Sequence, residues 1–183
     1  MTARIVLQQA DVARALTRIS HEILESNRGT ENLVILGIPT RGVVLARRIA
    51  ENIQRIEPGA VASPDAIVGA LDVTMYRDDL SRHPTRTPQP TSVPVPIDGK
   101  TVVLVDDVLY SGRTIRAALD ALNDLGRPRA VRLAVLVDRG HRELPIRADF
   151  VGKNLPSASS ERIFVRLDEI DGEESVTIEE GAA

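Results

Sequence analysis

The sequence predicts a single α/β domain, residues 1–183, built on a mostly parallel β-sheet with helices on both faces. A length of 183 residues suits one domain, and a hydrophobic content of 43% is enough for one buried core. Only 2% of the residues are aromatic, so that core must consist of Val, Ile, Leu and Ala. Uniformly apolar runs alternate with segments of helical period, which is typical of parallel strands that helices cover on both sides.

The first expected element is an amphipathic helix, DVARALTRISHEILESN, over residues 11–27. Its apolar side chains recur at the spacing of one helix face, and a group of polar ones falls on the opposite face: Arg14, Thr17, Arg18 and His21. On composition alone such a polar face is usually just solvated, so its function is left open at this point.

Strands and helices then alternate along the chain. The apolar run NLVILGI (32–38) predicts a strand and RGVVLARRIAENIQRI (41–56) a helix. AIVGALDVTMYR (66–77) is expected to form a longer strand. Beyond it, five prolines fall between Pro84 and Pro96, a composition that favours a lid, a binding loop or a disordered segment.

The second half of the chain repeats this order. TVVLVDD (101–107) predicts a strand, GRTIRAALDALNDLG (112–126) a helix, and VRLAVLV (131–137) another buried strand. RIFVRL (162–167) predicts one more strand.

The composition excludes several classes of site. There is no cysteine, which rules out disulfides, thiolate metal sites and a cysteine nucleophile, so any metal ion must be bound by oxygen. No apolar run approaches the length of about 18 residues that spans a membrane, and the first residues lack the apolar segment of a signal peptide. We therefore expect a cytoplasmic protein with no membrane partner.

Charge is unevenly distributed. The net charge of −3 argues against a nucleic-acid partner. However, residues 127–153 carry seven Arg or Lys against three acids, whereas residues 168–183 carry seven acids and no base. A solvated surface explains such asymmetry as well as a binding surface does.

Two adjacent acids, Asp106 and Asp107, end the strand that begins at residue 101. Ligands of open parallel sheets bind at this edge, where helix N-termini offer free N–H groups and a positive dipole to a phosphate. Ser111 and Thr114 add hydroxyl groups, and Gly112 allows the backbone to approach an anion closely. Simple helix capping is the alternative explanation of the hydroxyl groups, whereas the Walker A pattern is missing from this turn.

VVLVDDVLYSGRT (102–114) resembles the phosphoribosyl pyrophosphate (PRPP) signature of the type I phosphoribosyltransferases. GIPTRG (37–42) is similar to their pyrophosphate loop, and LDVTMYRDDLS (71–81) to the start of their flexible lid. The resemblance implies the type I phosphoribosyltransferase fold, with a small hood, a flexible lid loop at about 76–96 and a hood and base-recognition segment at about 138–160.

Residues 126–156 resemble one subgroup, the PyrR family of bifunctional pyrimidine-operon regulators with uracil phosphoribosyltransferase activity. The resemblance implies that the chain converts uracil and PRPP to UMP and diphosphate, senses UMP or UTP, and binds pyrimidine-operon leader RNA. It also implies a homodimer or a higher homo-oligomer. The alternative is a purely metabolic phosphoribosyltransferase of nucleobase salvage with no RNA role.

The resemblance also implies roles for individual residues. Asp107 and Arg77 are the expected catalytic residues, and Mg2+ is expected to bind mainly through PRPP, with no certain protein ligand. The expected base contacts are Arg139 and the backbone near Val165. The residues expected to bind PRPP or nucleotide are Thr40, Arg41, Asp106, Asp107, Val108, Leu109, Tyr110, Ser111, Gly112, Arg113 and Thr114.

The same resemblance assigns an RNA-binding role to the polar face of the first helix and to part of the basic segment. Its expected members are Arg14, Thr17, Arg18, His21, His141, Arg142, Arg147 and Lys153. Type I phosphoribosyltransferases also often hold a cis peptide in the pyrophosphate loop. Because a cis bond costs least before proline, we expect it at Ile38–Pro39.

Overall fold

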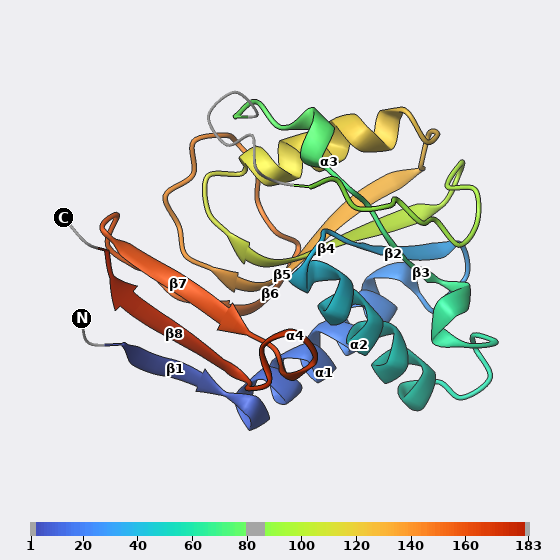
Figure 1. The fold of residues 1–183 in the computed structure, drawn as a ribbon. Coiled ribbons are helices and arrows are strands. Elements are labelled where there is room, and N and C mark those ends of the chain that lie inside the picture. The colour runs from blue at the N-terminus through green and yellow to red at the C-terminus, as the bar shows by residue number, and fades with distance from the viewer. Residues whose placement is uncertain (1–2, 80–86, 182–183) are drawn as a thin grey trace.

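The computed structural model describes residues 3–79 and 87–181, which fold into a five-stranded sheet with helices on both faces and a second, smaller sheet (Figure 1). The large sheet has the strand order β3-β2-β4-β5-β6, and all of its neighbouring strands are parallel. Its strands are β2 (Leu33–Gly37), β3 (Val68–Ala70), β4 (Thr101–Leu109), β5 (Ala130–Asp138) and β6 (Phe150–Asn154). The expected parallel α/β architecture is confirmed.

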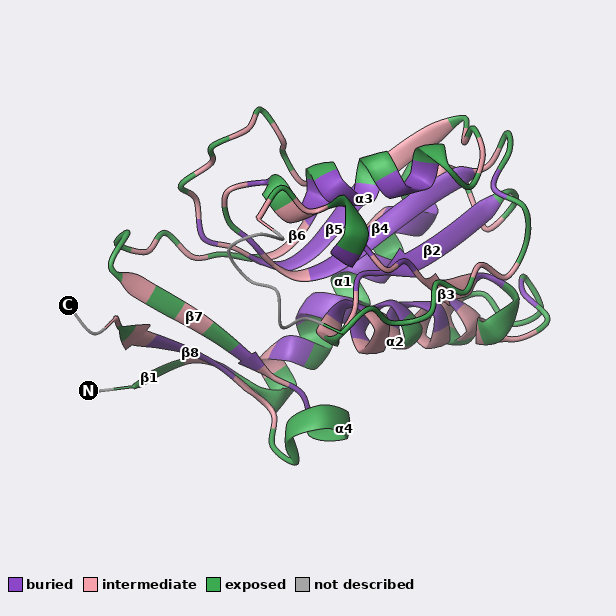
Figure 2. Cartoon of the chain, turned by 45° about the horizontal axis from the view of Figure 1, so that its top comes forward, coloured by how far each residue is buried: buried purple, intermediate pink, exposed green. Residues whose placement is uncertain are grey.

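Helices α1 (Gln9–Asn27) and α2 (Arg41–Ile56) cover one face of this sheet, and α3 (Arg113–Asn123) covers the other (Figure 1). Each face has its own apolar core. Leu16 of α1 and Leu45 of α2 belong to the first core, and Ile115 of α3 belongs to the second. Figure 2 shows β2, β4 and β5 as the buried centre between the two layers.

The segment 66–77 differs from the expected long strand. Only β3 is extended, flanked by two short 3-10 helices, η1 (Pro64–Ala66) and η2 (Thr74–Tyr76). The reason is local: the Asp72 carboxylate accepts hydrogen bonds from the backbone N–H and the hydroxyl of Thr74, and such side-chain bonds compete with strand pairing. The turn directs this segment across the end of the sheet.

The second sheet joins the two ends of the chain. It has the antiparallel order β1-β8-β7, with β1 (Arg4–Gln8), β7 (Glu161–Arg166) and β8 (Ser175–Glu180); α4 (Asp168–Asp171) lies between β7 and β8. This small sheet lies outside residues 138–160, and the hood expected within that range stays a prediction. Neither β1 nor β8 is predicted from the sequence, because each is short and is stabilised by pairing with the opposite end of the chain.

Residues 80–86, the central part of the expected lid, lie outside the described residues. Within the described parts, none of the helices is both long enough and apolar enough to cross a bilayer.

Candidate active site

A cavity of about 520 Å³ lies at the carboxyl edge of the large sheet, where the chain leaves β2, β3 and β4. Parallel strands bring these three exits to one edge, as expected for a ligand site in an open α/β sheet. The lining residues are Ile38, Pro39, Thr40, Arg41, Asp72, Val73, Thr74, Arg77, Thr87, Gln89, Asp106, Asp107, Val108 and Thr114. Seven of them are residues that the sequence assigned to catalysis or PRPP binding.

The loop between β2 and α2 forms one wall of the cavity and is packed tightly against β4. The backbone N–H of Ile38 donates to the carbonyl of Val105 at 2.9 Å. A Cβ on Gly42 lies only 2.4 Å from that same carbonyl oxygen, so this position accepts no side chain without movement of the backbone. Glycine therefore lets the start of α2 approach β4 and brings Thr40 and Arg41 to the cavity.

This loop contains a cis peptide, but the expected position was wrong. The cis bond joins Pro39 to Thr40 instead of Ile38 to Pro39. The expectation used only the intrinsic preference of X–Pro bonds, whereas the path of the loop between β2 and α2 depends on its packing against β4.

The two adjacent acids, Asp106 and Asp107, lie near the end of β4 and have different environments. Asp106 is 8% exposed, whereas Asp107 is partly exposed and accepts a hydrogen bond from the backbone N–H of Val108. Burial, followed by the neighbouring charge of Asp107, raises the pKa of Asp106 well above its ordinary value. Arg77 opposes this shift with its positive charge. The folded environment therefore opposes ionisation of Asp106.

The turn after β4 leads into α3 through a left-handed glycine. Gly112 has φ +92°, and the backbone N–H of Arg113 donates to the Ser111 hydroxyl at 3.3 Å. Thr114, in the first turn of α3, lines the cavity. Val108 and Leu109 belong to β4, which continues past the acids and pairs with β5 as far as Asp138.

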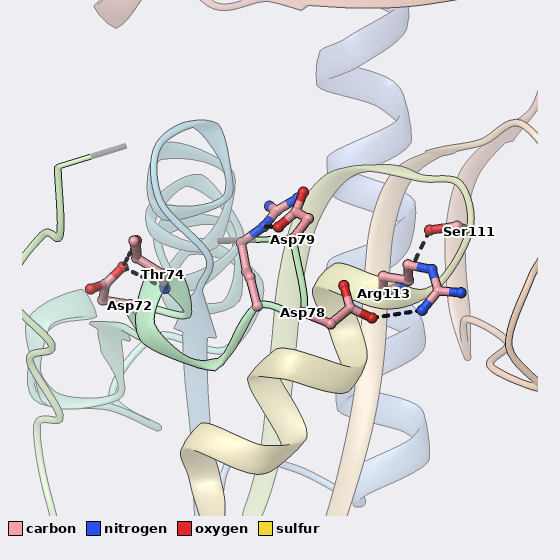
Figure 3. A network of polar contacts seen from close by, with 7 residues as sticks. Asp72, Thr74, Asp78, Asp79, Ser111 and Arg113 are labelled. Carbon is pink, nitrogen blue, oxygen red and sulfur yellow. Dashed lines mark hydrogen bonds and ion pairs between the residues drawn. The ribbon is translucent and has the colours of Figure 1, made fainter. Parts of the chain in front are cut away.

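Arg113, expected at the phosphate, does not line the cavity. Its guanidinium donates to Asp78 at 2.6 Å and to Glu143 at 2.7 Å, so it joins the start of the expected lid to the segment after β5. Figure 3 shows Asp78 and Ser111 on either side of it. Arg77 does line the cavity, and its guanidinium makes two hydrogen bonds to the carboxylate of Asp79.

Arg41 is the first residue of α2, and only part of its guanidinium group makes hydrogen bonds. One terminal nitrogen donates to Asp171 of α4 at 2.7 Å. Its Nε is buried and has no hydrogen-bond partner among the described residues. An unsatisfied buried donor beside the cavity is suited to an anionic ligand.

Four polar lining residues were missed by the sequence reasoning: Asp72, Thr74, Thr87 and Gln89. Asp72 and Thr74 form the hydrogen-bonded turn after β3 (Figure 3). A polar pair directly after an apolar run is the signal that could have indicated this turn. Thr87 and Gln89 lie in the proline-rich stretch, and nothing in their sequence pattern distinguishes them.

Comparisons with known proteins agree with this geometry. A family model described as a phosphoribosyl transferase domain matches residues 3–168. The Bifunctional protein PyrR of Leifsonia xyli subsp. xyli is 82% identical over 183 residues and is covered over 100% of both chains. That of Streptomyces coelicolor is 61% identical over 177 residues, covering 96% of this chain and 89% of its own.

The chain belongs to the PyrR family of phosphoribosyltransferases. The hypoxanthine phosphoribosyltransferase of Trypanosoma cruzi shares the fold, with a TM-score of 0.69 at 15% identity, over 98% of this chain and 97% of that one. The resemblance found in the sequence is thereby confirmed. The similarity to proteins named Bifunctional protein PyrR favours a bifunctional protein over a purely metabolic one.

The two base-binding residues expected of a PyrR protein lie outside the lining of the cavity. Arg139 is buried, donates to the Ser157 hydroxyl and to the carbonyls of Ala158 and Glu161, and stacks over the Tyr110 ring at 4.3 Å. Val165 is buried in β7 within the core shared with α1 and α2. Their contact with the base remains a prediction.

Of the expected RNA-binding residues, those from the first half of the chain lie on α1, which packs beside β6. Arg18 donates to the carbonyls of Val151 and Gly152, next to Lys153. Arg14 pairs with Asp11, and the hydroxyl of Thr17 donates to the carbonyl of Ala13. His21 and Lys153 are exposed, and neither side chain makes a hydrogen bond or a salt bridge within the described residues; the charge of Lys153 contributes to lowering the pKa of Asp11.

The remaining members of that set lie in the segment that connects β5 to β6. Arg142 donates to Asp138 and to the carbonyl of Tyr110, so it holds this segment against the turn between β4 and α3. His141 contacts the carbonyl of Ser157 and the edge of the Tyr110 ring. Arg147 is exposed, with no hydrogen-bond partner among the described residues.

Proposed function

We propose that the cavity of this PyrR-family protein transfers the phosphoribosyl group of PRPP to uracil, giving UMP and diphosphate. The observation that carries the proposal is the meeting of three features in one cavity. They are the acid pair at the end of β4, the first turn of α3 with Thr114, and the loop of Thr40 and Arg41. An anionic sugar phosphate needs hydroxyl acceptors, a phosphate cradle and cations, and the cavity supplies all three.

The residues of the cavity suggest separate roles in the transfer of the phosphoribosyl group. Asp106 and Asp107 accept hydrogen bonds from the ribose hydroxyls, and the start of α3 holds the 5′-phosphate. As the bond from C1 to diphosphate breaks, positive charge develops on the ribose. Asp107, the partly exposed carboxylate of the pair, stabilises that charge. N1 of uracil then bonds to C1 and loses its proton, which leaves with the diphosphate or passes to solvent. Arg41 and Arg77 stabilise the departing diphosphate.

The cavity also suits Mg2+ bound together with PRPP. Asp72, Asp106 and Asp107 place carboxylate oxygens around it, and these are the ligands that Mg2+ prefers. The described residues include no group of three or more His, Asp or Glu with the arrangement of a metal site. When bound, the ion neutralises charge on the diphosphate.

Base specificity is the sharpest test of the catalytic proposal. The purified protein is incubated with PRPP, Mg2+ and, in separate reactions, uracil, hypoxanthine or guanine. We expect UMP from uracil and no purine nucleotide above background. Formation of IMP or GMP in preference to UMP would contradict the proposal.

The second proposed activity is binding of pyrimidine-operon leader RNA by the cations of α1, β6 and the segment between β5 and β6. His21, Arg147 and Lys153 support this assignment, because their exposed side chains make no hydrogen bond within the described structure that an RNA phosphate would have to displace. Lys153 also acts on Asp11 through its charge. Arg18 and Arg142 already bind backbone carbonyls, so their replacement also alters packing.

A double variant, His21→Ala with Lys153→Gln, separates RNA binding from packing. We expect its affinity for leader RNA to fall at least about 10-fold, because each removed phosphate contact weakens binding and its salt dependence. UMP synthesis is expected to remain at the wild-type rate. Arg55→Gln with Arg127→Gln, two exposed arginines elsewhere, is the control in a gel-shift series, and it removes one positive charge more than the test variant does. Equal RNA affinity in the two double variants would refute the assignment.

UMP and UTP carry a ribose and a 5′-phosphate, as PRPP does. We therefore propose that the same cavity binds these nucleotides when the protein senses them. A dimer or higher oligomer is proposed because a chain of net charge −3 needs several basic clusters together to bind RNA. The proposed substrates and the leader RNA are cytoplasmic molecules, which supports the expected cytoplasmic location.

A further inference from the structure

A second cavity, of about 240 Å³, lies at the opposite, amino-terminal edge of the large sheet. It is formed where α1 ends and where β4, β5 and β6 begin. Its lining residues are Ile23, Ser26, Asn27, Arg28, Thr101, Val103, Arg129, Ala130, Arg132 and Phe150. None of the residues assigned to PRPP, uracil or RNA lines it.

The charge of this lining is all of one sign. Three arginines, from the end of α1 and from the beginning of β5, face the cavity, and no lining residue is acidic. Arg132 has a distant acidic neighbour, Asp149, at 3.9 Å. Arg129 donates to the Thr101 hydroxyl, a neutral partner, at 2.9 Å. Arg28 has no hydrogen bond from its side chain within the described structure.

The backbone at Arg28 is a further unusual feature. Arg28 follows α1 in the left-handed conformation, with φ +56°, a position where glycine is the common residue and where a longer side chain costs about 1 kcal/mol. An arginine in that conformation brings a cation to the rim of the cavity. The floor is apolar, because Ile23, Val103 and Phe150 belong to the core beneath α1.

We propose that this cavity binds a small phosphate-bearing molecule, with its phosphate between Arg28 and Arg129. Guanidinium groups bind phosphate oxygens through paired hydrogen bonds, and uncompensated cations over an apolar floor strengthen such contacts. The concave shape favours a small molecule over an extended RNA strand. The site lies at the other edge of the sheet from the active site, so it is independent of the proposed transfer reaction.

Inorganic phosphate is the probe, and backbone amide spectra of the full-length ¹⁵N-labelled protein locate its binding. The active-site turn, residues 111–114, serves as an internal reference for phosphate binding elsewhere in the same sample. We expect saturable shifts at residues 27–29 and 129–132. In Arg28→Gln with Arg129→Gln, the apparent Kd at these amides rises at least 10-fold, and the response at 111–114 is unchanged. The single variant Arg28→Gln, which removes no side-chain hydrogen bond, is expected to show a smaller loss.

Arg55→Gln with Arg127→Gln carries the same charge change outside the cavity, and its Kd is expected to match the wild type. Shifts confined to 111–114, shifts at 27–29 that do not saturate, or an equal loss in both double variants would overturn the proposal. A parallel gel shift distinguishes an RNA role. Leader-RNA affinity is expected to be equal in the two double variants, and a selective loss in Arg28→Gln with Arg129→Gln would overturn the small-molecule assignment.

Discussion

Asp106 places a carboxyl group where burial and a neighbouring carboxylate oppose its ionisation. Its pKa is raised in the folded protein above the ordinary value of 3.8. Between these two pKa values the native state binds more protons than the unfolded state, so the free energy of unfolding falls as pH rises. This loss of stability is complete above the raised pKa and is the cost of holding the acid pair at a site for ribose.

We therefore expect Asp106→Asn to stabilise the ligand-free protein at neutral and alkaline pH. An amide keeps an oxygen that can accept the backbone N–H of Asp107 but carries no charge. The melting temperature should rise by about 3 °C or more at pH 8, and the difference from wild type should shrink toward pH 4. UMP synthesis should fall by at least about 100-fold.

Thermal unfolding from pH 4 to pH 8 checks this expectation. Asp120→Asn, which changes an exposed acid of α3, is the control and should follow the wild-type curve. A lower melting temperature for Asp106→Asn than for wild type at pH 8 would show that the buried charge is stabilised by its surroundings instead.

At this scale the sequence indicated which residues of a motif lie at the cavity, but not which protein groups the other predicted residues contact. The acid pair, Thr40, Arg41 and Thr114 were placed in the cavity by local pattern, and they line it. Arg113 and Arg139 were assigned to ligands as well, yet their guanidinium groups bind protein acceptors from distant segments. No local pattern reveals such partners.

At the level of secondary structure, Arg48 of α2 binds the acidic segment at and after α4, residues 168–174. Its guanidinium donates to Glu169 at 2.6 Å and to Glu174 at 2.8 Å. The two carboxylates differ in burial: the Glu174 side chain is 5% exposed and that of Glu169 is 48% exposed. The acidic residues that looked like a solvated tail in the sequence thus hold the second sheet against the main domain.

Arg48→Gln is expected to lower the free energy of unfolding by about 3 kcal/mol, because Glu174 is left buried without its cation. Glu169→Gln should cost less than about 1 kcal/mol, as is usual for an exposed pair. Urea denaturation of both variants measures the two values. Equal losses would mean that burial of Glu174 does not determine the strength of this contact.

A helix or strand could be predicted from the sequence when the residues that determine it lie close together in the chain. No strand was expected at β6, but β2, β4 and β5 and helices α1, α2 and α3 follow from apolar runs and helical period, and each of these was expected within a few residues. The second sheet was not, because β1 and β8 pair across almost the whole length of the chain. β3 is shorter than expected because the Asp72 turn ends it.

Considered as a whole, the molecule brings the turn before α3, which leads to Thr114 at the proposed nucleotide cavity, into contact with the expected RNA-binding segment. Arg142 and Arg113 each connect the turn between β4 and α3 to the residues after β5. The backbone N–H groups of Glu143 and Leu144 also donate to the carbonyl of Ser111 in this turn. A ligand that changes the turn therefore acts on the segment that carries His141 and Arg147. Occupancy of one cavity can in this way influence both catalysis and RNA binding.

The most direct test of this shared cavity is the leader-RNA affinity measured as a function of UMP concentration, in wild type and in Thr114→Val. Thr114 lines the nucleotide cavity and is not one of the proposed RNA contacts. We predict that UMP changes the RNA Kd several-fold in wild type, that the variant binds RNA equally well without UMP, and that its response requires at least about 10-fold more UMP. An identical UMP response in the two proteins would contradict the account.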